Sequence, residues 1–582
     1  MQINNFKKIF NRVIKFLFIL VGMAVVVNTI SQMHINFTNI PQGDEWTILS
    51  NYLLFSNQHS SFIKYLWMQH NEHRVLVSKI IMILDLNYFE GKGILSRVIT
   101  LAAIFLNLTI FLIYLKKYVK EPSLVIYFIG CCVTVILFSD LQEENFIRGF
   151  NNQVVLVCTF FILSLWFMQK YFAYTNNFSG RLKKNFVFFV SILFACLSTY
   201  TMAGGILVWP ILIIYCWSKQ TAGSNKKAVI YIITISFFIV ASYLWKYKTP
   251  LHHSNPIQSI LDISSILKFS MIFIGNIVMP WGDEKCFLLG SFGFFTFIAI
   301  LLTLILKKEI FDDSNYLLVL IALFSIGISF FVALGRLKFG VTYGMSSRYI
   351  SFATPFWASL IILVFINLKK CNVKSVFPRN TALLLLLFLL VAILLRQNFM
   401  RNWANGEREG YEKGGLALML NVPDQQALSY LTSKAAERIL ASEILLLKKA
   451  PPFDSKTDAL VAKANFLLLD ERSKFGDWCT GYLDTVQKLG ESNNWLKIEG
   501  WAWDNINKYP PDLIIFSDSR KFSGLAKVII RREDVMLVYP TINEKKIGWF
   551  GYAKSDTDDL VYAYAFSNNH SSLCKLNQLV LK

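Results

Sequence analysis

Residues 316–334 read YLLVLIALFSIGISFFVAL, a run without a single charged side chain. A helix needs about 20 residues to cross the hydrocarbon core of a bilayer, so this run is long enough to span one. The whole chain of 582 residues is 54% hydrophobic and only 16% charged, with a mean hydropathy of +0.45. One water-surrounded core cannot hide so much apolar surface, and the sequence therefore predicts a polytopic α-helical membrane protein.

About eleven spans are expected. The first follows four basic residues, ends near Ile30 and lacks a small-residue cleavage site, so we expect an uncleaved signal anchor. The others are expected at about 95–115, 123–139, 152–172, 186–202, 204–217, 228–245, 287–306, 316–334, 350–368 and 381–396. The apolar stretch from Ser264 to Met279 is expected to form a re-entrant or interfacial helix instead.

The net charge of +20 comes from loops between these runs. Before Asn398 the chain has 34 basic and 15 acidic residues. From Asn398 onward it has 24 basic and 23 acidic residues, whose charges nearly cancel. With a cytoplasmic N-terminus, the basic clusters at 116–120, 181–184, 226–227, 307–308 and 369–374 all fall inside. This pattern argues against nucleic-acid binding. It predicts a multi-pass protein of the bacterial inner (cytoplasmic) membrane whose C-terminal region is periplasmic.

The sequence divides into a membrane part at 1–396, a helical connection at 397–475 and a β-rich domain at 476–582. Short strands are expected at 496–498, 513–516, 526–530, 535–538 and 560–566, which suggests a β-sandwich beside α-helices. Cys479 and Cys574 are the only cysteines of the β-rich domain, so we expect a disulfide between them outside the cytoplasm. The tryptophans of this domain are expected in its core rather than on a sugar-binding surface.

The first outer loop carries two polar clusters. Asp44 and Glu45 are adjacent carboxylates beside the membrane, suited to a general base or a metal ligand, although a solvated loop with a helix cap would also explain them. Further along lie His70, Asn71, Glu72, His73 and Arg74. On a helix the two histidines would share a face, which leaves a metal site open, and an arginine matches phosphate oxygens.

Two later outer loops add charged side chains next to spans. Glu144 and Arg148 precede the span at 152–172, and Arg336, Arg348 and Tyr349 lie around the loop before the span at 350–368. Ionisable residues at such places are functional candidates, while snorkelling to lipid headgroups is the alternative for the cations.

These motifs, in this order and on one side, resemble the GT-C class of membrane glycosyltransferases, and within it the Gtr-type O-antigen glucosyltransferases. The resemblance covers roughly residues 10 to 396. It rests on Gly-Asp-Glu-Trp from Gly43, Gln-His-Asn-Glu-His-Arg from Gln69, the Glu-x-x-x-x-x-Gly-Phe element from Glu143 to Phe150, and Ser-Arg-Tyr from Ser347. The C-terminal domain is longer than the simplest members of that family would lead us to expect.

The resemblance implies a polyprenyl-phosphate sugar as donor, transfer of glucose or another sugar, and a lipid-linked glycan as acceptor on the periplasmic face. Direct displacement by an acceptor hydroxyl that one carboxylate activates would invert the anomeric carbon. The resemblance makes Asp44 or Glu45 the base, Glu72 the reserve base, and the arginines ligands of the donor phosphate. These residues assign no cofactor, and a divalent metal stays open. The alternatives are a polysaccharide polymerase and a non-enzymatic flippase or transporter; the latter would place polar residues near the membrane midplane.

Overall fold

The computed structural model describes residues 2–57, 61–174, 178–219, 226–249, 256–370, 377–469, 475–490, 494–518, 521–554 and 561–579. The chain forms two compact units. The helical unit comprises Met1–Asn36, Ile63–Met82 and Leu95–Ala404, and the mixed unit comprises Phe37–Phe62, Ile83–Ile94 and Asn405–Lys582. The loop between the first two predicted spans is therefore divided between the two units.

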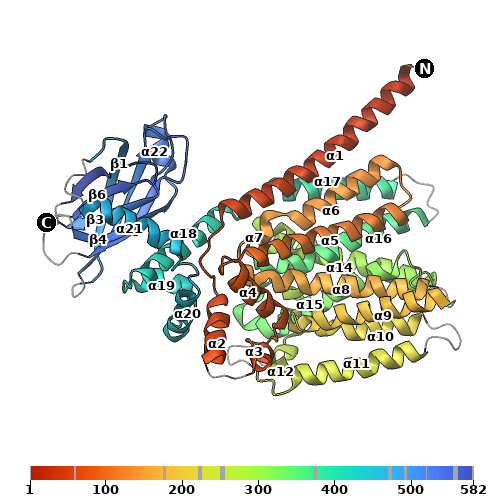
Figure 1. Cartoon of the computed structure of the whole chain (residues 1–582). Helices are drawn as coiled ribbons and strands as arrows, with labels where there is room; N and C mark the ends of the chain where they lie inside the picture. Colours follow the sequence, from red (N-terminus) through yellow and green to blue (C-terminus); the bar gives the residue numbers. More distant parts are fainter. Residues whose placement is uncertain are drawn as a thin grey trace. The chain divides into compact units, whose positions relative to one another are not determined.

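The long helices of the helical unit lie side by side, with α6, α8, α15 and α16 nearly parallel in Figure 1. These helices are α1 (Gln2–Ile35), α5 (Ile94–Tyr118), α6 (Ser123–Phe138), α8 (Asn152–Ala173), α9 (Phe178–Thr199), α10 (Val208–Ser218), α11 (Lys226–Leu244), α13 (Ile263–Gly275), α14 (Asp283–Leu306), α15 (Tyr316–Arg336), α16 (Ile350–Lys370) and α17 (Phe377–Leu394). Shorter helices are α3 (Phe62–Trp67), α4 (Leu76–Tyr88), α7 (Glu143–Ile147) and α12 (Pro256–Leu261). The 3-10 turns are η1 (Asp140–Gln142), η2 (Gly149–Asn151), η3 (Ala203–Leu207), η4 (Asn276–Trp281), η5 (Leu337–Phe339), η6 (Val341–Met345) and η7 (Ser347–Tyr349).

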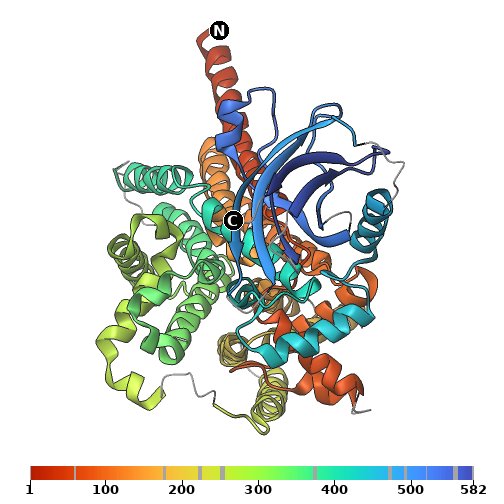
Figure 2. The same ribbon diagram turned by 90° about the vertical axis from the view of Figure 1, so that its left-hand side faces the viewer.

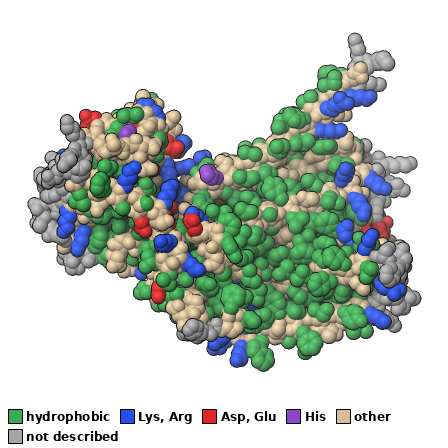
Figure 3. Space-filling model, in the orientation of Figure 1, with side chains coloured by type: hydrophobic (Ala, Val, Ile, Leu, Met, Phe, Trp, Pro, Cys, Tyr) green, Lys and Arg blue, Asp and Glu red, His purple; other side chains and the backbone are tan. Residues whose placement is uncertain are grey.

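Ten helical segments in the described residues are long and apolar enough to cross a membrane, and nine of them coincide with predicted spans. The predicted spans at 204–217 and 381–396 form shorter apolar helices, Ala203–Ser218 and Pro378–Leu394. The tenth segment is Ile263–Trp281, which we expected to be re-entrant or interfacial. Hydrophobic side chains cover the flank of the helical body in Figure 3, as a lipid environment requires.

Helices α13 and α14 approach so closely that their contact positions must be glycine. A Cβ added at Gly290 would lie 1.8 Å from the carbonyl oxygen of Met271, and one at Gly275 would lie 1.9 Å from that of Cys286. Small residues allow such backbone contact between membrane helices. The close pairing holds η4 beside the start of α14.

The helical unit has two chemically different ends. The polar end, where α6, α9 and α15 end and α8 and α16 begin, carries the acidic and arginine side chains described below. The opposite end carries Lys116 and Lys117 in the last turn of α5 and Lys170 in that of α8. Figure 3 shows Lys and Arg side chains at the right-hand end of the helical body. The sequence predicted that the lysine-rich end is cytoplasmic, and this orientation stays a prediction.

The mixed unit packs part of the first loop against C-terminal helices. Helix α2 (Glu45–Asn57) lies against α20 (Ala435–Leu447), and the hydroxyl of Thr47 donates a hydrogen bond to Glu437 at 2.5 Å. The hydroxyl of Thr38 donates to Glu412 at 2.6 Å. The other helices are α18 (Arg401–Met419), α19 (Gln425–Leu431), α21 (Ser455–Leu469) and α22 (Glu533–Val538).

The described residues of the C-terminal region form one seven-stranded antiparallel sheet of order β1-β2-β5-β4-β3-β6-β7. The strands are β1 (Cys479–Lys488), β2 (Trp495–Asp504), β3 (Leu513–Asp518), β4 (Lys521–Ile530), β5 (Gly548–Lys554), β6 (Val561–Phe566) and β7 (Cys574–Leu579). The expected β-sandwich is wrong, because all seven strands belong to a single curved sheet (Figure 2). The expected strand at 535–538 is also wrong, since these residues end helix α22.

The predicted disulfide between Cys479 and Cys574 is present and joins the two edge strands, β1 and β7. Curvature of the sheet brings these edge strands together, and the disulfide joins them covalently where no ladder of backbone hydrogen bonds does. Trp501, Trp503 and Trp549 are buried, as expected for core residues.

Candidate functional site

The acidic pair of the first loop belongs to the mixed unit, where it opens helix α2. Glu45 is buried, and its Oε2 accepts a hydrogen bond from the backbone N–H of Gln42 at 2.8 Å. The indole of Trp46 donates to the carbonyl of Pro41 at 2.8 Å and closes the same turn. Asp44 is exposed. The structure thus separates two acids that the sequence could not: Glu45 holds the turn, whereas the side chain of Asp44 reaches solvent.

His70 and His73 face each other across a tight backbone turn rather than along a helix. The amide of each donates to the carbonyl of the other at 2.8 Å, and Asn71 has a φ of +49°. Asn adopts this left-handed conformation more readily than most residues. The expected shared helical face is therefore wrong. Among the described residues, no group of three or more His, Cys, Asp or Glu side chains is placed to hold a metal ion.

Glu72, in the same turn, binds a guanidinium from a distant part of the chain. Its Oε1 accepts a hydrogen bond from Nη2 of Arg336 at 2.5 Å and lies 3.4 Å from Nε2 of His73. The Nδ1 atom of His73 accepts a hydrogen bond from the amide of Ala203 at 3.3 Å. A neutral His73 therefore carries its proton on Nε2, directed at Glu72.

Glu144 is shared by two arginines. Its Oε1 lies 2.8 Å from Nη1 of Arg148 and 3.8 Å from Nη1 of Arg348. Arg348 also donates a hydrogen bond to the phenol oxygen of Tyr343, and the guanidinium of Arg148 lies 5.5 Å from the ring of Trp403. One carboxylate thus faces two cations, which leaves this group with a net positive charge.

The two carboxylate groups lie at the same polar end of the helical unit. The ring of His70 meets that of Phe150 edge-on, with centroids 5.2 Å apart. The guanidinium of Arg336 lies 6.0 Å from the ring of Phe339. That ring lies 5.2 Å from the ring of Tyr343, over which the guanidinium of Arg348 lies at 5.5 Å. We call Glu72, Glu144, Arg148, Arg336 and Arg348 the arginine–glutamate cluster. Three arginines against two glutamates give it a formal charge that favours an anionic ligand.

Hydrogen bonds between the link that follows α6 and the start of α16 position this cluster. The side-chain amide of Asn145 donates to the carbonyl of Arg348 at 2.9 Å and to the hydroxyl of Ser351 at 2.8 Å. The hydroxyl of Ser347 donates to the carbonyl of Leu141 at 2.6 Å. These buried bonds connect residues about 200 positions apart and fix the backbone from which Arg348 extends.

Arg74 was expected to bind the donor phosphate, but its side chain makes structural contacts instead. It is buried, and its guanidinium donates to the carbonyls of Tyr243, Trp67 and Trp245. Burial lowers the pKa of Arg74 from its usual value. Because three backbone carbonyls occupy its donors, Arg74 ties the first loop to the end of α11 and does not belong to the arginine–glutamate cluster.

Two other buried cations were missed in the sequence. The ammonium of Lys79 donates to the carbonyls of Tyr65 and Met68 at 2.9 and 2.6 Å, near the end of α3, and burial together with the charge of Arg74 lowers its pKa to about 7. The guanidinium of Arg97 binds the carbonyl of Ile147. Each interrupts an apolar run, and that interruption is the signal that could have identified them.

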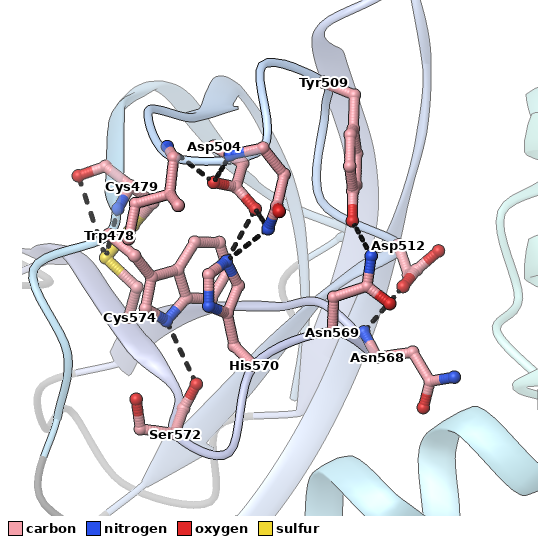
Figure 4. A network of polar contacts seen from close by, with 12 residues as sticks. Trp478, Cys479, Asp504, Tyr509, Asp512, Asn568, Asn569, His570, Ser572 and Cys574 are labelled. Atoms are coloured by element: carbon pink, nitrogen blue, oxygen red, sulfur yellow. Dashed lines mark hydrogen bonds and ion pairs between the residues drawn. A yellow bond between two sulfur atoms is a disulfide. The ribbon is translucent and has the colours of Figure 1, made fainter.

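A second polar network lies in the mixed unit. Nε2 of His570 is 2.7 Å from Oδ2 of Asp504, and the His570 ring stacks on Trp478 with centroids 4.1 Å apart (Figure 4). Burial raises the pKa of Asp504, but hydrogen bonds from Asn507 and His570 outweigh it and hold that pKa below its usual value. This network anchors the loops beside the disulfide.

The fold defines the class of the molecule: a multi-pass helical membrane protein with a C-terminal β-domain. Comparisons with protein family models, with curated proteins and with solved structures find no match to this chain. The likeness to the GT-C class therefore rests on the order of the sequence motifs, and the activity that it implies is a proposal.

Proposed function

We propose that the chain is a glycosyltransferase that moves a sugar, most simply glucose, from a polyprenyl phosphate to a lipid-linked surface glycan such as O-antigen. The reaction takes place at the periplasmic face of the bacterial inner membrane. The observation that carries this proposal is the arginine–glutamate cluster, because Arg148 and Arg348 share one carboxylate beside an apolar helical body. A periplasmic enzyme has no nucleotide sugar at hand, so its activated sugar must arrive on a lipid carrier.

The arginines suit the leaving group of such a reaction. A guanidinium binds phosphate oxygens through paired hydrogen bonds, and these bonds strengthen as negative charge develops on the phosphate. Glu144 holds Arg148 and Arg348 apart and oriented before the donor arrives. The aromatic ring of Trp403 covers one face of the Arg148 guanidinium and limits its movement.

The transfer step is a direct displacement. The oxygen of an acceptor hydroxyl forms a bond to the anomeric carbon while the bond from that carbon to the phosphate oxygen breaks. The polyprenyl phosphate leaves with the electron pair, and the hydroxyl proton passes to a carboxylate base. The configuration at the anomeric carbon is inverted.

Asp44 and Glu72 are the candidates for that base. The carboxylate of Glu45 is committed to the turn before α2, which makes it a poor proton acceptor. Asp44 is exposed on the mixed unit, and Glu72 lies in the arginine–glutamate cluster. The variants Asp44→Asn and Glu72→Gln distinguish the two candidates. The base is the residue whose variant loses transfer but still binds substrate.

The disulfide supports the proposed periplasmic location of the mixed unit. Disulfides persist in oxidising compartments such as the periplasm and are rare in the cytoplasm. The lysine-rich end of the helical unit supports a cytoplasmic location for that end.

The test is the structure of the surface glycan from cells with and without this gene. We expect loss of the gene to remove one sugar substituent without shortening the glycan, and the wild-type gene to restore it. Asp44→Asn or Glu72→Gln should fail to restore it, with the protein present in the membrane. A shortened glycan would indicate a polymerase, and an unchanged glycan would refute the proposal.

A further inference from the structure

An apolar groove of about 800 Å³ lies within the helical unit, between α14, α16 and α17. Leu289 and Phe292 of α14, Trp357 of α16, and Leu385 and Leu389 of α17 line it. Its size is typical of a ligand site. Because hydrocarbon is as apolar as these side chains, the groove can hold a lipid chain without burying any polar group.

Two cations mark one end of this groove. Lys285, in the first turns of α14, lines it beside Trp281, and the guanidinium of Arg396 lies 4.5 Å from the Trp281 ring. The indole of Trp281 donates a hydrogen bond to the carbonyl of Ala392 at 3.2 Å, which joins η4 to α17. The groove therefore has an apolar body and a cationic head.

Among the residues that the structure describes, no acidic side chain neutralises either cation. Within the described ranges, Lys285 and Arg396 have no carboxylate partner, although Asp283 and Glu284 are close in sequence to Lys285, and Nε of Arg396 is buried without a hydrogen-bond partner. Such cations beside lipid are costly unless they bind an anion. They also lie at the polar end of the unit, away from the lysines of the opposite end.

The head of the groove adjoins the loop that carries Arg348. The indole of Trp357 donates to the carbonyl of Ile274 at 2.8 Å, and the side-chain amide of Asn276 donates to the carbonyl of Gly344 at 3.4 Å. These contacts connect η4 with the segment from η6 to the start of α16. The groove is separate from the arginine–glutamate cluster but shares the same end of the helical unit.

We propose that this groove binds the isoprenoid chain of a polyprenyl diphosphate, the carrier of the acceptor glycan, and that Lys285 and Arg396 bind its diphosphate. This inference rests on the proposed function, in which two lipid-linked molecules must meet. The arginine–glutamate cluster takes the donor phosphate, so the acceptor carrier needs a second chain groove and a second anion site. Two cations at the head of one groove match two adjacent phosphate groups.

The test is binding of undecaprenyl diphosphate to the purified full chain in detergent, with undecaprenyl phosphate and phosphatidylglycerol as competitors. Lys285→Gln combined with Arg396→Gln should weaken diphosphate binding about tenfold or more, because two charge-assisted contacts are lost. Arg148→Gln combined with Arg348→Gln should leave it unchanged. Equal losses in both double variants, or no loss in the first, would overturn the proposal.

The groove itself is tested by filling it. Leu289→Trp should weaken diphosphate binding, whereas Leu288→Trp, at the exposed neighbouring position, should not. Equally tight binding of phosphatidylglycerol would mean a general lipid contact and contradict a carrier site. Binding needs no turnover, so the two proposals can fail separately. If diphosphate binds as expected but loss of the gene leaves the surface glycan unchanged, the groove is supported and the proposed function is refuted. Normal transfer with unaltered binding in the Lys285 and Arg396 variant would refute the groove alone.

Discussion

The carboxylate of Glu72 and the guanidinium of Arg336 lie 2.5 Å apart although 264 positions separate them in the sequence. Both side chains are mostly buried, at 14% and 19% exposure. The pair connects the turn of the first loop with the end of α15. The pair therefore has a structural role. In the proposed function it also positions the Arg336 guanidinium beside the donor phosphate.

Arg336→Lys tests whether that geometry matters. Lysine keeps the charge but lacks the planar fork, so it cannot hold Glu72 and a phosphate oxygen at once. We expect the kcat/KM of transfer to fall about tenfold or more while membrane insertion persists. Lys338→Arg, two positions away, is the control and should transfer at the wild-type rate. A full rate in Arg336→Lys would exclude Arg336 from the donor site.

Glu45 and Asp44 are expected to differ in stability as well as in activity. Glu45→Ala removes the acceptor of the Gln42 amide, and loss of a comparable cap costs about 1 kcal/mol. That cost should lower the Tm of the mixed unit by about 2–4 °C. Asp44→Asn should leave the Tm unchanged, because the position is exposed and Asn caps the first turn of a helix as well as Asp does. Thermal unfolding in detergent measures both, and equal Tm losses would contradict the separate roles.

The spans were predictable because lipid imposes one simple rule, an apolar run of sufficient length between charged loops. The run at 316–334, for example, became α15 with nearly the same bounds. The disulfide was predictable because Cys479 and Cys574 had no other partner in their domain. In both cases local composition alone decides the outcome.

The remaining features depend on partners far along the chain. Alternating side chains indicated strands β2, β3, β4 and β6, but nothing local shows that β5 pairs with both β2 and β4 to make one sheet. Arg74 has the right chemistry for a phosphate, yet two of the three carbonyls that occupy it belong to Tyr243 and Trp245, about 170 positions later. The short apolar run at 535–538 suited either a strand or a helix, and sequence could not decide.

The disulfide should dominate the stability of the β-domain. It closes a loop of 95 positions, and cross-links of that length stabilise folded domains by about 2–5 kcal/mol. Reduction should therefore lower the Tm of this domain in the full chain by several degrees. The Cys479→Ser and Cys574→Ser double variant should show the lower Tm already and not respond to reductant. A wild-type Tm that is insensitive to reductant would contradict this role.

The Asp504 network should weaken in acid. The pKa of Asp504 is lower in the folded state than its usual value of 3.8, so its contribution to the free energy of unfolding is present above that pH and lost as the pH falls below it. Asp504→Asn should remove this part of the acid dependence. Fluorescence of Trp478, which stacks on His570, reports the change. Asp512→Asn, outside the His570 contact, should keep the wild-type profile; an unaltered profile in Asp504→Asn would refute the assignment.

The most direct measurement is sugar transfer by the purified chain with Arg148→Gln and Arg348→Gln combined, using a polyprenyl-phosphate sugar as donor. The two arginines share Glu144, and their loss should lower kcat/KM about a hundredfold or more, with the Tm close to that of the wild type. Lys170→Gln, at the lysine-rich end, is the matched control and should transfer normally. Transfer by the double variant within about twofold of the wild type would show that the arginine–glutamate cluster does not bind the donor phosphate.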